Sequence, residues 1–129
     1  MKSKQISVLI YGHDARLLES RKWVMQSWGY RALSIRSIAA LNRVPLTPPI
    51  DLLVLCHTLS AKECESAIAH ARLRWPNVKE LALVRHSAMR DASPVLSDVQ
   101  KALDAPDRLI SVIGQLVGHA SSSSYSHIY

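Results

Sequence analysis

The sequence is poor in the residues that build several common kinds of functional site. It contains two cysteines, Cys56 and Cys64, too few for a disulfide framework, and we expect both to be thiols. Its four glycines form no Gly-rich phosphate loop, and neither a Gly-x-Ser-x-Gly elbow nor a paired-carboxylate pattern is present. These absences argue against a nucleotide-cradling loop, and we expect neither a cofactor nor enzymatic activity.

Long apolar runs are also absent. No stretch approaches the roughly 20 residues that span a bilayer, and residues 1–5 lead straight into a strand pattern rather than into a signal peptide. Of the 129 residues, 48% are hydrophobic and 20% are charged, as in ordinary globular proteins of one domain. We therefore expect a cytoplasmic protein without a membrane partner.

Acidic residues are outnumbered by basic ones. Sixteen lysines and arginines against ten acidic residues give a formal net charge of +6, which raises the possibility of a polyanionic partner. The basic residues are scattered, however, and Arg21 and Lys22 are the one adjacent pair. This spacing favours a solvated basic surface, and nucleic-acid binding is the less favoured alternative.

Apolar runs of strand length alternate with helical patterns through the first half of the chain. Residues 6–11 are β-branched and apolar, and Gly12 closes this strand. Asp14 is a helix N-cap residue and Gly29 a helix stop signal. The apolar face expected between them consists of Leu17, Leu18, Val24, Met25 and Trp28. The pattern thus predicts a strand followed by a helix whose buried face includes Trp28.

The middle of the chain repeats this alternation. A strand is predicted over residues 31–35, and a short helix over residues 37–44 is limited by the prolines that follow. Residues 51–56 form a continuous apolar run typical of a strand covered on both faces. Ser60 then begins a capping box, and the helix behind it, which ends before Trp75, has its apolar face at Cys64, Ala67, Ile68 and Ala71.

The last third is less regular. A strand is predicted over residues 81–84, a loop over 86–94 and a weak strand near 98–103. A helix begins at Pro106 and ends at Gly118; its buried face is Leu109, Ile110, Ile113, Leu116 and Val117. We expect one domain over residues 1–119, followed by a Ser-rich tail over residues 120–129. Strands that alternate with helices predict an α/β fold with a parallel sheet and helices on both faces.

Cysteine and histidine side chains are predicted to gather at one edge of this sheet. Open α/β sheets place their sites at the carboxyl ends of the strands, where Cys56 and His57 follow a strand and His13 and His86 follow others. Cys56 is expected to pack as a small apolar residue. The alternative is a reactive thiol, or a site for zinc or a similar metal formed with these histidines.

Two segments resemble a known family. The stretch VLIYGHDARLLESRKWVMQSWGY, residues 8–30, resembles the start of a bacterial response-regulator receiver domain, and DLLVLCHTLS, residues 51–60, resembles its third strand. The resemblance covers residues 5 to about 118. It implies a doubly wound, five-stranded parallel sheet in the order 2-1-3-4-5. Because the segment between Val84 and Pro106 is short for the family, a short or missing fourth helix is expected.

The resemblance also assigns positions to the family's phosphate-accepting pocket. The phosphoacceptor aspartate corresponds to Cys56, the acidic pair to Gly12 and His13, and Asp14 is the one acid left beside them. The switch hydroxyl corresponds to Val84 or Ser87, and the lysine to Lys101. Phosphoryl transfer in this family needs a carboxylate nucleophile and oxygen ligands for magnesium. We therefore expect that aspartyl phosphorylation is absent.

These features predict a stand-alone pseudo-receiver that acts in signalling through protein contacts. The protein partner is unknown, and a homodimer is an open alternative. The first helix, with an outward Trp23, is a candidate contact surface, and Tyr125, Ile128 and Tyr129 could let the tail dock on a neighbour. A thiol or metal sensor that uses Cys56 is the second hypothesis, and a nucleic-acid-binding module is the third.

Overall fold

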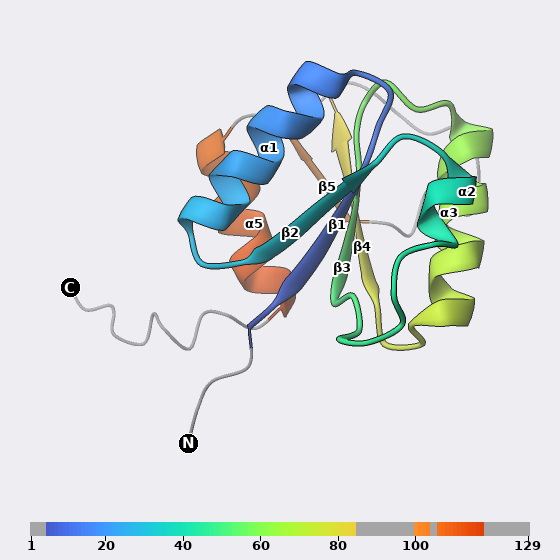
Figure 1. The fold of residues 1–129 in the computed structure, drawn as a ribbon. Helices are drawn as coiled ribbons and strands as arrows, with labels where there is room; N and C mark the ends of the chain where they lie inside the picture. Colours follow the sequence, from blue (N-terminus) through green and yellow to red (C-terminus); the bar gives the residue numbers. More distant parts are fainter. Residues whose placement is uncertain (1–4, 85–99, 104–105, 118–129) are drawn as a thin grey trace.

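The computed structural model describes residues 5–84, 100–103 and 106–117. Within them the chain forms one five-stranded parallel sheet in the order β2-β1-β3-β4-β5 (Figure 1). The strands are β1 (Ser7–Tyr11), β2 (Arg31–Ile35), β3 (Leu52–Leu55), β4 (Lys79–Val84) and β5 (Gln100–Leu103). The predicted parallel sheet and its strand order are confirmed.

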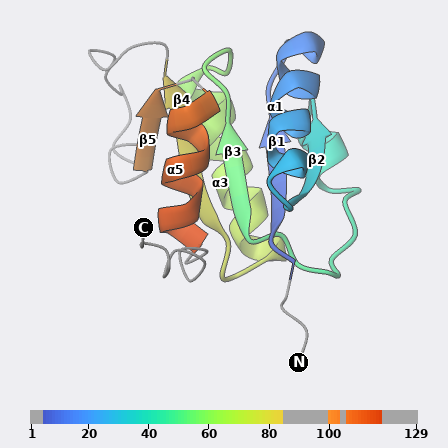
Figure 2. The same ribbon diagram turned by 90° about the vertical axis from the view of Figure 1, so that its left-hand side faces the viewer.

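Helices cover both faces of this sheet, as the sequence predicts. One face carries α1 (Ala15–Ser27) and α5 (Pro106–Val117), and the other carries α2 (Ile38–Leu41) and α3 (Ala61–Arg74) (Figures 1 and 2). The segment with the expected short or missing fourth helix, residues 85–99, lies outside the described residues, as does the predicted tail. In the described ranges, no helix is long and apolar enough to cross a bilayer.

Side-chain caps fix where the helices begin. The Asp14 carboxylate accepts hydrogen bonds from the backbone N–H groups of Arg16 and Leu17, at 2.9 and 3.2 Å. At α3, Ser60 and Glu63 form the predicted capping box, in which each side chain accepts from the other's backbone N–H. Such caps satisfy N–H groups that have no partner inside the helix.

Element boundaries differ from the predictions by a few residues. Helix α2 is shorter than predicted, with Ser37 as its N-cap and Asn42 as its C-cap. Strand β4 begins two residues early because the backbone N–H of Lys79 donates to the Asp51 carbonyl at 3.0 Å and so extends the pairing with β3. This pairing is backbone chemistry, so the polar side chains at the start of β4 do not prevent it.

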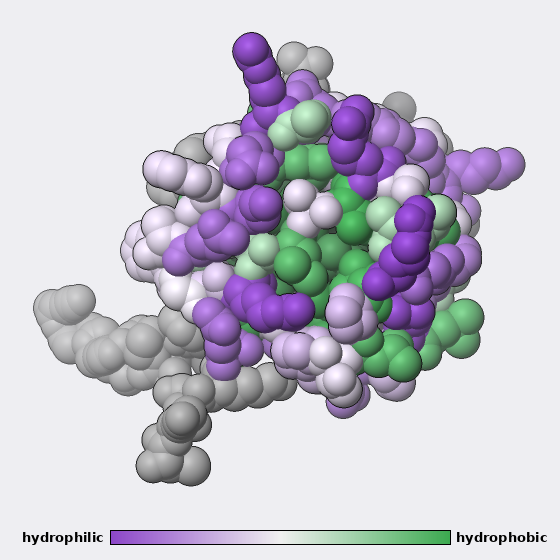
Figure 3. All heavy atoms as spheres, in the orientation of Figure 1, coloured by the Kyte–Doolittle hydropathy of each residue, from purple (hydrophilic) through white to green (hydrophobic). Residues whose placement is uncertain are grey.

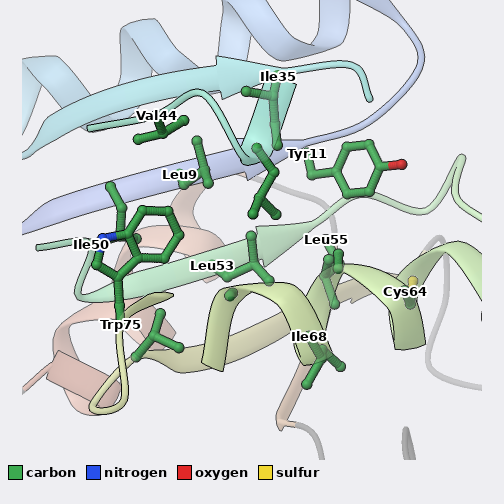
Figure 4. Packing of buried hydrophobic residues seen from close by; sticks show 14 residues of the cluster. Leu9, Tyr11, Ile35, Val44, Ile50, Leu53, Leu55, Cys64, Ile68 and Trp75 are labelled. Atoms are coloured by element: carbon green, nitrogen blue, oxygen red, sulfur yellow. The ribbon is translucent and has the colours of Figure 1, made fainter. Parts of the chain in front are cut away.

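The sheet separates two buried clusters. The larger lies against α2 and α3 and is closed at one end by Trp75, which is 2% exposed (Figure 4). The smaller lies against α1 and α5 and includes Leu18, Met25 and Ile113. Both cysteines are buried, Cys64 in the larger cluster and Cys56 in the smaller. The two clusters together cover both faces of β1 and β3, which explains the continuous apolar runs of these strands.

The prediction that Trp28 belongs to the core is wrong, because this side chain is 59% exposed. Helix α1 ends at Ser27, and Trp28 is its C-cap with φ −98° and ψ 9°. The side chain therefore leaves the helical periodicity on which the prediction rested. Trp23 is 72% exposed, as predicted, so two large aromatic side chains of this region face solvent.

Candidate functional site

The candidate site lies at the carboxyl ends of β1 and β3, where the chain continues into residues 12–14 and 56–58. Hydrogen bonds extend the sheet past both strands: the Cys56 N–H donates to the Tyr11 carbonyl at 3.0 Å, and the Gly12 N–H donates to the Ile35 carbonyl at 3.2 Å. Backbone pairing thus holds Gly12 and Cys56 side by side, the positions to which the receiver resemblance assigns an acid and the phosphoacceptor.

Gly12 and Cys56 pack tightly against each other. A Cβ atom added to Gly12 would lie 3.0 Å from Cys56 Cβ, 3.1 Å from Cys56 Sγ and 3.3 Å from Leu18 Cδ2. Cys56 is 4% exposed and belongs to the buried cluster beneath α1. An acidic side chain at position 12 does not fit while Cys56 and Leu18 keep these positions. In place of a polar pocket, this part of the site is an apolar contact.

His13 faces α3. Its Nε2 atom lies 2.8 Å from Glu63 Oε2, and its backbone N–H donates to the Thr58 hydroxyl at 3.2 Å. The imidazole also packs edge-on against the Tyr11 ring, with 6.3 Å between the ring centroids. These contacts join the loop after β1 to the loop after β3 and to the first turn of α3.

Glu63 is the acidic group at the centre of this arrangement. The pKa of Glu63 is lowered, chiefly because its carboxylate accepts a hydrogen bond from the backbone N–H of Ser60. Burial opposes this effect, and the hydrogen bond and charge of His13 lower the pKa further. The pKa of Tyr11 is raised, mainly because its phenol is buried and also because Glu63 and Cys64 lie nearby. The site therefore holds a carboxylate and a neutral phenol near pH 7.

An open depression of about 570 Å³ adjoins these groups. It is lined by Tyr11, Ile38, Ser60, Lys62, Glu63 and Ser66. The Tyr11 hydroxyl points away from the aliphatic side chains of the core (Figure 4). In the sequence, Glu63 is visible only as a capping residue. Its contact with a histidine 50 positions away depends on the crossover from β3 to α3, which no local pattern reveals.

Other residues assigned by the receiver resemblance lie at or near the same edge. Asp14 caps α1, so its carboxylate serves that helix. Lys101 is in register with Ala82, which is in register with Leu55, the last residue of β3. Its backbone is therefore level with the end of β3, and Val84 is the last residue of β4. Ser87 lies outside the described residues.

The residues proposed as thiol or metal ligands do not form one group in the described part of the chain. There, no cluster of three or more histidine, cysteine or acidic side chains is arranged to hold a metal ion. Cys56 is buried, His57 is half-buried, and His13 is exposed and pairs with Glu63. His86, the fourth candidate, lies outside the described residues.

The fold is that of the CheY-like receiver domains of response regulators. The signal receiver domain of an HD domain-containing protein from Pseudomonas fluorescens Pf-5 aligns with a TM-score of 0.71 and 12% identity, covering 92% of this chain and 99% of that one. A CheY-like response regulator receiver domain from Methylobacillus flagellatus aligns with a TM-score of 0.70 and 14% identity, covering 88% and 99%.

A third solved structure is similar to the same extent. A response regulator receiver protein from Sinorhizobium medicae WSM419 aligns with a TM-score of 0.67 and 19% identity, covering 89% of this chain and 96% of that one. No known family model and no curated protein matches the sequence. The structural likeness therefore establishes the receiver fold, and the chemistry of the site has to be argued from this chain's own residues.

Proposed function

We propose that this protein is a receiver-fold signalling module that acts through contacts with another protein and does not accept a phosphoryl group. The observation that carries the proposal is the contact between Gly12 and Cys56. It fills with apolar atoms the place where receiver chemistry needs carboxylates. Cys56 and Cys64 are buried thiols, in keeping with a cytoplasmic location.

Each step of receiver phosphorylation would lack its group at this site. A buried thiol stands in place of the carboxylate nucleophile, and magnesium prefers several oxygen ligands in octahedral geometry. Gly12 has no side chain to contribute, and the Asp14 carboxylate is hydrogen-bonded to α1. The His13 imidazole pairs with Glu63 and is a poor magnesium ligand. A module without phosphotransfer can still signal by binding a partner.

The test is native mass spectrometry of the purified chain before and after incubation with magnesium and acetyl phosphate. We expect an unchanged mass. A gain of one phosphoryl group would overturn the proposal, and the Cys56→Ser variant would then show whether Cys56 carries it. The same spectra report whether the chain is a monomer or a dimer and whether it carries a metal ion.

A further inference from the structure

Tyr11 is a buried polar side chain whose hydroxyl has no hydrogen-bond partner in the described part of the chain. The residue is 2% exposed, and its ring packs against His13 and the larger buried cluster. Its hydroxyl points away from the aliphatic side chains of the core (Figure 4), and the residue lines the open depression beside α3. A buried tyrosine usually finds a partner for its hydroxyl. Here the depression is the side from which that partner can approach.

The other polar groups of this depression are mainly hydrogen-bond donors. Lys62 is exposed and makes no ion pair with a described residue. The Ser60 hydroxyl oxygen accepts from the Glu63 N–H at 3.1 Å, which leaves the hydroxyl proton to donate. Ser66, one turn further along α3, adds another hydroxyl to the lining. Three hydroxyl groups and one ammonium group therefore surround a space in which a ligand that accepts hydrogen bonds is favoured.

Glu63 limits the charge that such a ligand can carry. Both of its carboxylate oxygens are engaged, Oε1 by the Ser60 N–H and Oε2 by His13 Nε2, each at 2.8 Å. Because its pKa is lowered, the carboxylate stays charged near pH 7 and repels a nearby anion. The charge of Lys62 balances one negative charge on a ligand. A dianion such as phosphate would keep an excess negative charge beside Glu63, so a monoanion is favoured.

The depression also has an apolar part. Ile38, at the start of α2, lines it and packs against the larger cluster. Figure 3 shows apolar side chains in a hollow ringed by hydrophilic ones on the face that carries β2 and α2. The volume of about 570 Å³ lies within the range of small-molecule sites in proteins. Because the depression is open, a short aliphatic chain can lie against Ile38 while part of the ligand stays in water.

We propose that this depression binds a small aliphatic monocarboxylate. The ligand's carboxylate accepts hydrogen bonds from the Tyr11 hydroxyl and the Lys62 ammonium group, and its aliphatic chain lies against Ile38. The N-terminal end of α3, the positive end of the helix dipole, favours the same negative charge. The inference goes beyond the proposed function, because it needs neither a protein partner nor Cys56. Phosphorylation is tested separately by mass spectrometry, so either statement can fail without the other.

The experiment uses the full chain, labelled with ¹⁵N and titrated with butyrate at pH 7.5 and constant ionic strength. We expect saturable shifts of the backbone amide signals of Lys62 and Ser66, with a dissociation constant on the order of 1 mM. Butyramide, which has the same shape without the charge, and inorganic phosphate should each bind at least threefold more weakly. No saturation, shifts centred away from α2 and the start of α3, or equal binding of either control would overturn the proposal.

Two pairs of variants test the hydroxyl and the charge separately. Tyr11→Phe should weaken butyrate binding about threefold to tenfold, whereas Tyr30→Phe, in the other buried cluster, should leave it unchanged. Lys62→Gln should weaken binding to a similar extent, whereas Lys79→Gln, at the start of β4 and so at the opposite end of the parallel strands, should not. Equal effects within either pair would contradict the proposal.

Urea denaturation of Tyr11→Phe gives a readout that does not depend on the ligand. Because the Tyr11 hydroxyl has no described partner in the protein, its removal should leave the free energy of unfolding unchanged or slightly increased. A clear loss of stability would mean that the hydroxyl is already satisfied within the folded chain, and would overturn the proposal.

Discussion

At the scale of single residues, the small size of Gly12 and Cys56 explains why the two residues pack closely in the candidate site. Gly12 suits its position because a Cβ there would lie 3.0 to 3.3 Å from Cys56 and Leu18, so these side chains would have to move by a few tenths of an ångström. Cys56 in turn fits because a thiol is small and loses little when it is buried. Asp51, in contrast, is a polar residue with a structural role. Its carboxylate accepts a hydrogen bond from the Ser7 N–H at 2.9 Å.

The packing at position 12 leads to a first prediction. Gly12→Ala should lower the free energy of unfolding by about 1–3 kcal/mol, because an added methyl group must displace Cys56 or Leu18. Urea denaturation followed by circular dichroism measures this change. Gly114→Ala is the control, because a Cβ there meets nothing within 4 Å and alanine favours a helix, so a gain of up to about 1 kcal/mol is expected. Similar changes in the two variants would show that position 12 is not tightly packed.

The burial of Cys56 leads to a second prediction, which separates the signalling module from a thiol sensor. Neither Cys56 nor Cys64 should react with an alkylating reagent at an appreciable rate until the protein is unfolded in denaturant, because both side chains are buried. Mass spectrometry of intact protein counts the labels. Rapid labelling in the native state that is lost in Cys56→Ser would support the sensor hypothesis, since reactive thiols are accessible and have a lowered pKa.

At the scale of whole elements, the first turn of α3 serves two purposes. Ser60 and Glu63 cap the helix, and the same Glu63 carboxylate holds His13 in the loop after β1. The start of one helix therefore positions a loop that belongs to the other side of the site. A capping motif, which the sequence shows as a local feature, therefore also contributes to tertiary structure.

The carboxylate of Glu63 leads to a third prediction. Its pKa is lower in the folded chain than its ordinary value of 4.5, so its contribution to stability is present above about that pH and is lost as the pH falls through the folded pKa. Glu63→Gln keeps a capping acceptor but has no charge to titrate. Between pH 6 and pH 3, the parent chain should therefore lose more stability than this variant.

Urea denaturation at the two pH values measures this difference. Glu65→Gln is a suitable control, because it changes the same chemistry two residues further along α3, beyond the capping box. Equal losses in the parent chain and in Glu63→Gln would mean that Glu63 is as solvated in the folded state as in the unfolded one.

At the scale of the whole molecule, the surface carries a dispersed positive charge and exposed aromatic side chains. A net charge of +6 raises the local concentration of acidic partners around the protein. The exposed Trp23 and Trp28 add apolar area near the end of α1. These features are compatible with the proposal that the protein acts through contacts with another protein.

The dispersed charge leads to a fourth prediction, which concerns nucleic acid. Binding of a labelled DNA duplex, measured by fluorescence anisotropy, should be weak at low salt and absent near 150 mM salt, because scattered charges contact few phosphates at once. A polyanion without sequence, such as heparin, should compete equally well. Tight binding that persists at 150 mM salt would instead support the third hypothesis, a nucleic-acid-binding module.

Much of the fold could be predicted from the sequence because its signals are local. The caps at Asp14 and Ser60, the stop at Gly29 and the apolar strands act over a few residues, and strand-helix alternation then restricts the topology. The buried places of Cys56 and Cys64 follow from the same periodicity. Trp28 shows the limit of this reasoning, since one residue beyond a helix end the periodicity no longer applies.

The sequence by itself thus determined the order of the elements and the parallel sheet. Tertiary structure alone decided that Gly12 packs against Cys56 and that His13 meets Glu63. The physical reason is the separation along the chain over which each interaction acts. Caps and periodicity depend on neighbours along the chain, whereas these contacts form between segments that only the folded sheet brings together.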